Sequence, residues 1–143
     1  MTVHLIKLCV GADSIEDLAQ WQAERLKAMK AAGEKPLLSH RTFQTPKRHD
    51  ALLDGGSLYW VIKGFIRARQ KLVGFDETTD DQGRKYCVFL VERKLIPTAA
   101  RAMQPFQGWR YLDQARAPSD AKAGDSADVP PEMAAELRRL GLI

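Results

Sequence analysis

The most informative chemistry in the sequence lies in a segment that follows Gly64, where aromatic and basic residues alternate with apolar ones. Alternate residues of a β-strand point to opposite faces, so a strand here predicts one face that carries Phe65, Arg67, Arg69 and Lys71. Three cations and an aromatic ring on one surface can hold phosphates while they stack a base. The ordinary solvated face of an antiparallel sheet shows the same alternation, so both interpretations stay open. The opposite face is mainly apolar and is predicted to lie on the core: Ile66, Ala68, Gln70 and Leu72.

A second basic cluster lies between residues 39 and 49, in the sequence SHRTFQTPKRH. Thr45 and Pro46 resemble the start of a short helix, and exposed amides at a helix N-terminus suit an anion. Arg41, Lys47 and Arg48 would add positive charge to such a site. A capped helix with surface charges explains the same residues, so the anion site is one of two hypotheses.

A third cluster gathers aromatic residues around Gly108, with Phe106, Trp109, Arg110 and Tyr111 within six positions. These side chains could line a ligand pocket in which Arg110 meets an acidic group. Core packing, with Gly108 permitting a turn and the arginine at the rim, accounts for the same cluster.

The sequence offers little for catalysis or metal binding. The three histidines, His4, His40 and His49, have no metal-ligand spacing with each other or with cysteine, so we expect no metal and no cofactor. Cys9 and Cys87 lie in apolar runs, where a buried thiol is inert. No Walker-type loop, dinucleotide fingerprint or Gly-x-Ser-x-Gly motif is present, so we assign no catalytic residue.

The elements that would position these residues follow from hydrophobic periodicity and turn signals. A capping box at residues 13 to 17 predicts a helix over 14 to 32 whose apolar stripe includes Leu18 and Trp21. The run from 57 to 75, interrupted at Gly64, predicts a bulge, a bend or two strands. Residues 95 to 98 are expected to leave the sheet. The other expected elements are strands at 3 to 10, 37 to 43, 86 to 92 and 106 to 112, a short helix at 47 to 54 and a hairpin connection at 76 to 85.

Composition limits the class of protein. The chain has 143 residues, of which 45% are hydrophobic and 28% charged, which suits one globular domain and excludes wholesale disorder. The net charge of +4 permits a polyanionic partner. No apolar stretch approaches the length of a membrane span, and the start lacks the features of a secretory signal, so we expect no membrane partner and a cytoplasmic location.

The end of the chain changes in composition. Residues 114 to 129 are rich in Ala, Ser, Asp, Lys and Gly and are predicted to form a flexible linker after a single domain at 1 to 113. Pro130 and Pro131 then open a predicted amphipathic helix at 130 to 143, whose apolar face could dock on a partner or on a second copy.

Three stretches resemble a bacterial family of uncharacterised domains over roughly residues 1 to 120: TPKR at 45 to 48, GGSLYWVIKG at 55 to 64 and FQGWRYL at 106 to 112. That resemblance implies no activity. At the level of element order alone, the chain is also similar to PUA-like domains, including the ASCH and EVE groups. Those small β-barrels bind RNA or modified nucleobases, but no binding residue carries over from them.

These observations predict an α+β fold, a small and mostly antiparallel barrel or curved sheet with flanking helices. The leading functional hypothesis is a module that binds RNA or a nucleotide through Arg67, Arg69 and Lys71. A second is a protein-interaction or homo-oligomerising module that uses the C-terminal helix. A third is a small enzyme that acts on an anionic substrate at Arg41, Lys47 and Arg110, for which no acid, base or nucleophile stands out.

Overall fold

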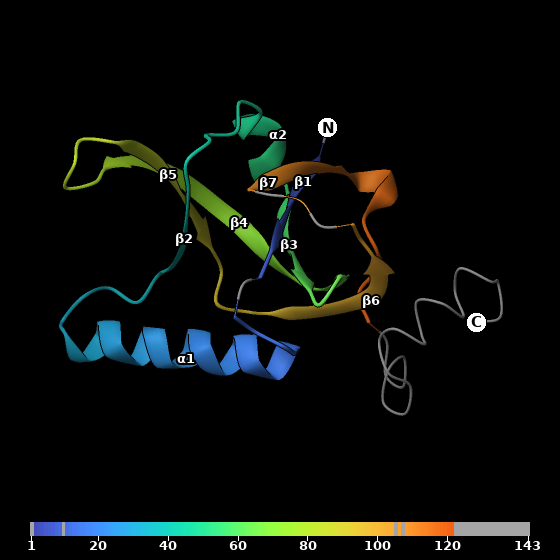
Figure 1. The fold of residues 1–143 in the computed structure, drawn as a ribbon, viewed down its shortest axis with the longest axis horizontal. Coiled ribbons are helices and arrows are strands. Elements are labelled where there is room, and N and C mark those ends of the chain that lie inside the picture. The colour runs from blue at the N-terminus through green and yellow to red at the C-terminus, as the bar shows by residue number, and fades with distance from the viewer. Residues whose placement is uncertain (1, 10, 105, 107, 122–143) are drawn as a thin grey trace, which may run out of the picture.

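The sheet is built around one long strand, β4 (Phe65–Thr79), which pairs with three neighbours. The computed structural model describes residues 2–9, 11–104, 106 and 108–121. In these described residues, seven strands and two α-helices follow one another (Figure 1). The elements besides β4 are β1 (Val3–Leu8), α1 (Ile15–Ala31), β2 (Leu38–Thr42), α2 (His49–Leu53), β3 (Ser57–Ile62), β5 (Lys85–Val91), β6 (Ile96–Ala102), β7 (Trp109–Asp113) and a 3₁₀ turn, η1 (Gln114–Arg116).

The strands form one mixed, mostly antiparallel sheet in the order β2-β5-β4-β3-β1-β7, with β6 paired to β4 off this path. Among the pairings of the described strands, that of β1 with β3 alone is parallel. The sheet curves without closing, so the predicted α+β fold with a curved sheet is confirmed and the barrel alternative is wrong. Of the helices in the described part of the chain, none has the length and apolar character to cross a bilayer.

The sheet includes one strand that the sequence did not predict. Residues 95 to 98 were expected to leave the sheet, but β6 pairs Ile96 with Arg69 and Pro97 with Ala68 of β4. Pro97 suggested a strand end because it has no N–H to donate. An outer strand tolerates proline, since one edge of its backbone needs no ladder partner.

β3 and β4 join through a two-residue turn at Lys63 and Gly64, both at positive φ (50° and 83°). Such a turn matches the twist of a β-hairpin, and glycine adopts its backbone without strain. The predicted interruption at Gly64 therefore divides two strands. A β-bulge follows, because the register shifts between Ile66 and Ala68.

The bulge breaks the alternation that placed Phe65 beside the basic residues. Arg69 lies opposite Tyr59 and Phe65 opposite Ile62, and facing residues of paired strands share a side of the sheet. Tyr59 and Ile62 are three positions apart in β3, so they point to opposite faces. The prediction of one face with Phe65, Arg67, Arg69 and Lys71 is therefore wrong, although Ile66, Ala68, Gln70 and Leu72 are all buried as predicted.

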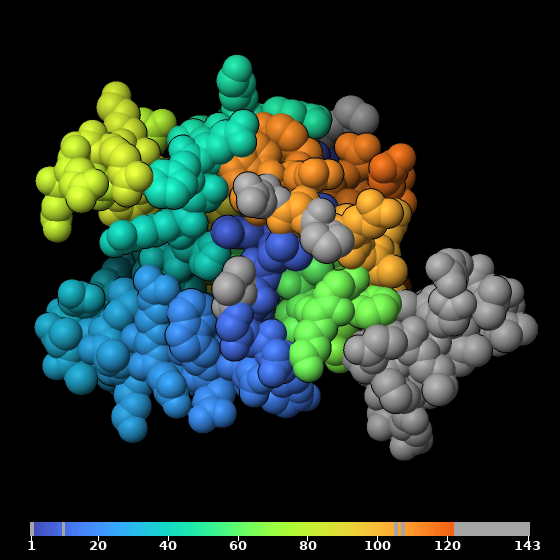
Figure 2. All heavy atoms as spheres, in the orientation of Figure 1, coloured from blue at the N-terminus to red at the C-terminus, as the bar shows by residue number. Residues whose placement is uncertain are grey.

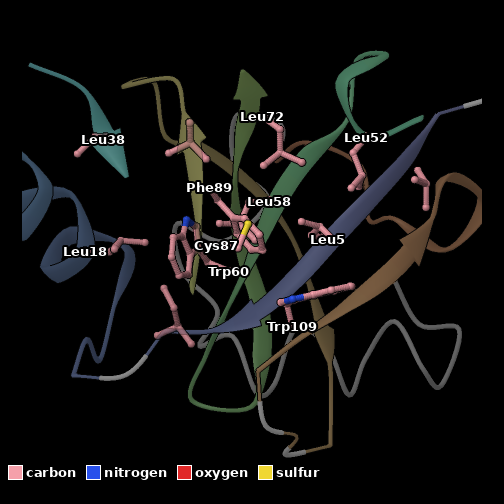
Figure 3. Close-up of a cluster of buried hydrophobic side chains, with 13 residues drawn as sticks. Leu5, Leu18, Leu38, Leu52, Leu58, Trp60, Leu72, Cys87, Phe89 and Trp109 are labelled. Atoms are coloured by element: carbon pink, nitrogen blue, oxygen red, sulfur yellow. The ribbon is translucent and has the colours of Figure 1, made fainter. Parts of the chain in front are cut away.

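The main core lies where both helices meet one side of the sheet, and Figure 3 shows Leu18 of α1 and Leu52 of α2 pointing into it. The helix predicted over 14 to 32 is confirmed, and Ser14 caps it by accepting a hydrogen bond from the Asp17 amide (3.1 Å). Trp21 was predicted in the apolar stripe but is 50% exposed, and the buried position one residue on is Gln22.

The described chain continues past β7 as part of the fold. The linker was predicted to begin at residue 114, yet η1 follows β7 directly and the Ala121 amide donates to the Pro97 carbonyl (2.9 Å). Thr98 and Asp120 form an antiparallel bridge. Residues 119–121 thus line the edge of β6, and the predicted C-terminal helix lies outside the described residues.

Candidate functional site

A cavity of about 400 Å³ opens between the end of β2, the β4–β5 hairpin and the start of β7. In Figure 2 the yellow-green hairpin, the cyan segment after β2 and orange β7 gather on one face of the molecule. We call this the basic cavity; its lining residues are Lys7, Arg41, Thr42, Phe43, Asp80, Arg84, Tyr86 and Gly108.

Backbone pairing brings the two long segments of the wall together. β2 runs antiparallel to β5, with Arg41 opposite Val88 and Thr42 opposite Cys87. At the start of β5 the hairpin closes on Asp80, whose carboxylate accepts from the amides of Gln82 (2.9 Å) and Arg84 (2.8 Å). This local bonding is typical of aspartate in turns, and it holds Arg84 at the rim of the cavity.

The cavity is positively charged. Lys7, Arg41 and Arg84 supply three cations against the single carboxylate of Asp80, which leaves a net charge of +2. Hydrogen bonds from the Arg84 backbone hold the pKa of Asp80 below its usual value, so this carboxylate stays ionised and paired with Arg84 Nε (3.0 Å). Partial burial lowers the pKa of Lys7, because the ammonium group has lost part of its hydration.

Each arginine of the cavity lies against an aromatic ring. The guanidinium carbon of Arg41 is 4.7 Å from the Tyr86 ring centre, and that of Arg84 is 5.3 Å from the Phe43 ring centre. Phe43 is 72% exposed, so it offers a wide apolar face to solvent. Arginine and aromatic planes side by side are the combination that binds bases and phosphates together.

The segment after β2 is fastened to β7. The indole nitrogen of Trp109 donates to the Gln44 carbonyl (2.7 Å). The Tyr111 hydroxyl accepts from the backbone amides of Lys47 (2.9 Å) and Arg48 (3.3 Å). Trp109 is therefore a buried supporting residue, and the Arg48 side chain lies over the Tyr111 ring (5.5 Å) beside the cavity.

The predicted helix-terminus anion site does not form. α2 begins at His49 instead of residue 47, and its N-cap, Arg48, makes no capping hydrogen bond through its side chain. The amides of Lys47 and Arg48, which an anion would need, are taken by Tyr111. Both side chains remain exposed, so they add positive charge beside the cavity without forming a site of their own.

Arg110 lies apart from the other predicted anion-binding residues. It pairs with Ile6 in β1, whereas its neighbour Trp109 pairs with Lys7, so the two side chains point to opposite faces. The Arg110 guanidinium lies over Phe106 (5.1 Å) in a separate apolar cluster. The hypothesis of an enzyme site formed by Arg41, Lys47 and Arg110 therefore has no common cavity among the described residues.

The strand residues Arg67, Arg69 and Lys71 also lie outside the basic cavity. Arg69 is bound by the carboxylate of Asp120 through Nε (2.7 Å) and Nη2 (3.0 Å). Arg67 is the extra residue at the bulge, half-buried, and Lys71 is exposed. Because Arg69 already holds an anion, this strand offers less free charge than the sequence pattern indicated.

His40 and the two cysteines support the core beside the cavity. The His40 ring meets Trp60 edge-on at 4.8 Å, and burial, with the nearby charges of Lys7 and Arg25, lowers its pKa to about 4. Cys87 is fully buried, as predicted, and burial raises the pKa of its thiol and of the Cys9 thiol. Within the described chain, no three His, Cys, Asp or Glu side chains are grouped as a metal site would require.

Comparison with known families gives a match over most of the chain. The family described as Protein of unknown function (DUF1489) matches residues 5–143. The chain belongs to the DUF1489 family. The sequence resemblance to an uncharacterised family is thereby confirmed, and the match extends further than residue 120. Neither the curated proteins nor the solved structures give a significant match to this DUF1489 protein, so its similarity to PUA-like domains stays a prediction.

In this DUF1489 protein, Arg41 is the cavity residue that was predicted from the sequence, whereas most of the wall was not: Lys7, Phe43, Asp80, Arg84 and Tyr86. These residues come from three separate stretches of the chain, at residue 7, at residue 43 and at residues 80 to 86, and no local pattern joins them. One signal was available, because Asp80 followed by Gly83 predicts a tight hairpin that fixes the register of β5. That register places Tyr86 opposite Thr78, but the position of β2 beside β5 depends on pairing between distant residues.

Proposed function

We propose that the basic cavity binds a nucleotide unit of a single-stranded nucleic acid. The observation that carries this proposal is the pairing of cations with aromatic rings around one cavity: Arg41 with Tyr86 and Arg84 with Phe43. A base stacked on an exposed ring contributes about 1 to 3 kcal/mol, and phosphates add a charge-dependent component. Phe43 is the ring best placed for stacking, because nearly three quarters of it is exposed.

The charges of the cavity suit a phosphate in its interior. Lys7 is half-buried, and the ammonium group would recover from a phosphate the interactions that it has lost from water. Arg41 and Arg84 lie at the rim of the cavity. The pairing of β2 with β5 positions Arg41, and the β4–β5 hairpin positions Arg84. Such preorganised groups lose little freedom on binding, which favours affinity.

The surface beside the cavity extends the same chemistry. Lys47 and Arg48 are exposed on the segment that carries Phe43, and Arg48 lies against Tyr111. A strand longer than one nucleotide could follow this segment, with its phosphates near both side chains. A cytoplasmic location, which the sequence predicts, would place the protein among such ligands.

The competing hypotheses have less support. The predicted enzyme residues do not share a cavity, and Asp80, the carboxylate of the basic cavity, is already held by Arg84. A protein-interaction role through the C-terminal helix depends on residues outside the described part of the chain. Nucleic-acid binding is the function for which the described residues supply both charge and stacking surface.

The test is a titration of the full chain with fluorescent single-stranded RNA and DNA of about ten nucleotides, a length that covers one site of this kind. Three neutralised phosphates predict a slope of log affinity against log salt of roughly −2. Phe43→Ala and Arg41→Gln should each weaken binding about tenfold, because each removes a stacking or charge-assisted contact.

Matched controls distinguish binding at the basic cavity from nonspecific attraction between a basic protein and nucleic acid. Leu53→Ala removes another exposed apolar side chain, and Lys85→Gln another exposed cation, outside the cavity lining. Both should bind as the unchanged protein does. The proposal is wrong if neither nucleic acid binds at about 50 mM salt, or if the controls lose as much affinity as the cavity variants.

A further inference from the structure

A second cavity, of about 360 Å³, lies on the other face of the sheet. We call it the polar cavity; the residues that line it include His4, Tyr59, Arg69, Gln114, Ser119 and Asp120. Tyr59 and Trp60 are neighbours in β3, and Trp60 faces the main core, so Tyr59 points to the opposite side. This cavity therefore shares no lining residue with the basic cavity.

The hydrogen bonds of the wall fix the protonation of His4. The Ser57 amide donates to His4 Nδ1 (2.9 Å), so Nδ1 carries no proton. The other ring nitrogen, Nε2, then donates to Gln114 Oε1. This bond orients the Gln114 amide and leaves its NH₂ group as a donor. Burial lowers the pKa of His4, which keeps the ring neutral.

The charges of the wall cancel. Arg69 binds Asp120 through two hydrogen bonds (2.7 and 3.0 Å), and its Nη1 donates to Ser57 Oγ (2.9 Å). With His4 neutral, one cation faces one anion. A charged ligand would have to displace a partner that is already in place, so the wall favours a neutral ligand.

The Tyr59 hydroxyl takes no part in these hydrogen bonds. Tyr59 is 4% exposed, lines the cavity and meets the His4 ring edge-on at 5.1 Å. Across the described residues, no side chain or backbone group forms a hydrogen bond with its hydroxyl. Buried polar groups nearly always pair with protein or with water, so a buried hydroxyl at a cavity wall is free to bond a ligand that enters the cavity.

We infer that the polar cavity binds a small neutral molecule with several hydroxyl groups, such as a monosaccharide. The wall mixes an acceptor, the Asp120 carboxylate, with donors on Gln114 and Arg69 and with Tyr59, which does both. A hydroxyl donates and accepts at once, so adjacent ligand hydroxyls can satisfy all of these groups. The volume suits one sugar ring.

The experiment is an amide NMR titration of the full chain with ribose, glucose, myo-inositol and, separately, inorganic phosphate. At least one polyol should cause saturable shifts at His4, Ser57 and Ser119, and phosphate should not. Tyr59→Phe keeps the ring and removes only the hydroxyl, so it should weaken polyol binding about tenfold.

Tyr86→Phe is the matched control, because it removes a hydroxyl from the other cavity and should leave polyol binding unchanged. Three results would each overturn the inference: no polyol gives saturable shifts, phosphate binds here in preference to polyols, or Tyr59→Phe binds as well as the unchanged protein. Phe43→Ala should have no effect, which keeps this test independent of nucleic-acid binding.

Discussion

Gln22 of α1 and Gln70 of β4 form a reciprocal amide pair beneath the helix. Gln22 Nε2 donates to Gln70 Oε1 (2.9 Å), and Gln70 Nε2 donates back to Gln22 Oε1 (2.8 Å). Gln70 also accepts from the Trp60 indole (2.9 Å) and donates to the Glu92 carbonyl (3.1 Å). Both residues are buried, so α1 is joined to the sheet by directional bonds as well as by apolar packing.

The first prediction concerns this pair. Gln70→Met keeps the side-chain volume but leaves Gln22, Trp60 and Glu92 without their buried partner. Unfolding in urea should show a loss of about 3 kcal/mol, because each unsatisfied buried group costs about 1 to 3 kcal/mol. The control is Gln20→Met, since Gln20 is exposed on the same helix and bonds only Glu24 (3.3 Å). If both variants lost the same stability, the amide pair would have no special role.

The second prediction concerns Gly56, where α2 returns to the sheet. A β-carbon there would lie 2.2 Å from the Leu52 carbonyl oxygen and 2.4 Å from that of Val3. Both are backbone atoms that cannot move aside, so Gly56→Ala should destabilise the protein by more than about 2 kcal/mol. At Gly74 the nearest atom is a flexible Leu90 methyl at 3.4 Å, so Gly74→Ala serves as the mild comparison. A thermal midpoint for Gly56→Ala equal to that of Gly74→Ala would contradict this account.

The third prediction is a pH dependence. The pKa of His40 falls from 6.5 to about 4 on folding, so between these values the unfolded chain binds a proton that the folded chain does not. The stability is therefore complete above pH 6.5 and declines as the pH falls toward 4, by up to about 3 kcal/mol. Burial also lowers the pKa of His4, which adds to the same slope.

His40→Gln should reduce this slope, measured as the free energy of unfolding between pH 4 and pH 6.5. His49 is exposed, so His49→Gln is the control and should keep the slope of the unchanged protein. A slope that survives His40→Gln intact would show that other groups govern the acid response.

The fold was largely predictable because its signals are local. Helix α1 follows from one capping sequence and one period, and the hairpin at Gly64 follows from an interrupted apolar run. The bulge at Arg67 was not predictable, since it is defined by the register in which β4 pairs with β3 and β6. One inserted residue then moved Phe65 to the other face, which removed the surface that the period-two pattern had indicated.

The candidate sites were harder to predict because they depend on contacts between distant residues. Arg69 was predicted to bind an anionic ligand, but in the structure it pairs with Asp120, which lies in a stretch whose composition indicated a linker. Trp21 fitted the helical stripe, yet the buried position is Gln22, whose amide finds its partner in Gln70. A polar residue can occupy a core position when a residue distant in the sequence supplies its hydrogen-bond partner. The sequence alone does not identify that partner.

The last prediction concerns the contact between Arg69 and Asp120, which helps to hold residues 119–121 against the sheet. The Asp120 side chain is 49% exposed and that of Arg69 23%, so solvent screens the pair and Asp120→Ala should cost no more than about 1 kcal/mol of global stability. Its effect should instead be local. The amides of Ala99 and Ala121 bond Ser119 and Pro97 across this edge (2.8 and 2.9 Å), and both should exchange with solvent faster in Asp120→Ala. High salt should bring the exchange rates of the unchanged protein closer to those of the variant, because salt weakens the ion pair.

Asp81→Ala, at the exposed hairpin, is the control and should leave the exchange of both amides unchanged. Unchanged exchange in Asp120→Ala would mean that the backbone bonds hold this segment alone, and unfolding of the whole sheet would mean that the segment is part of its cooperative core.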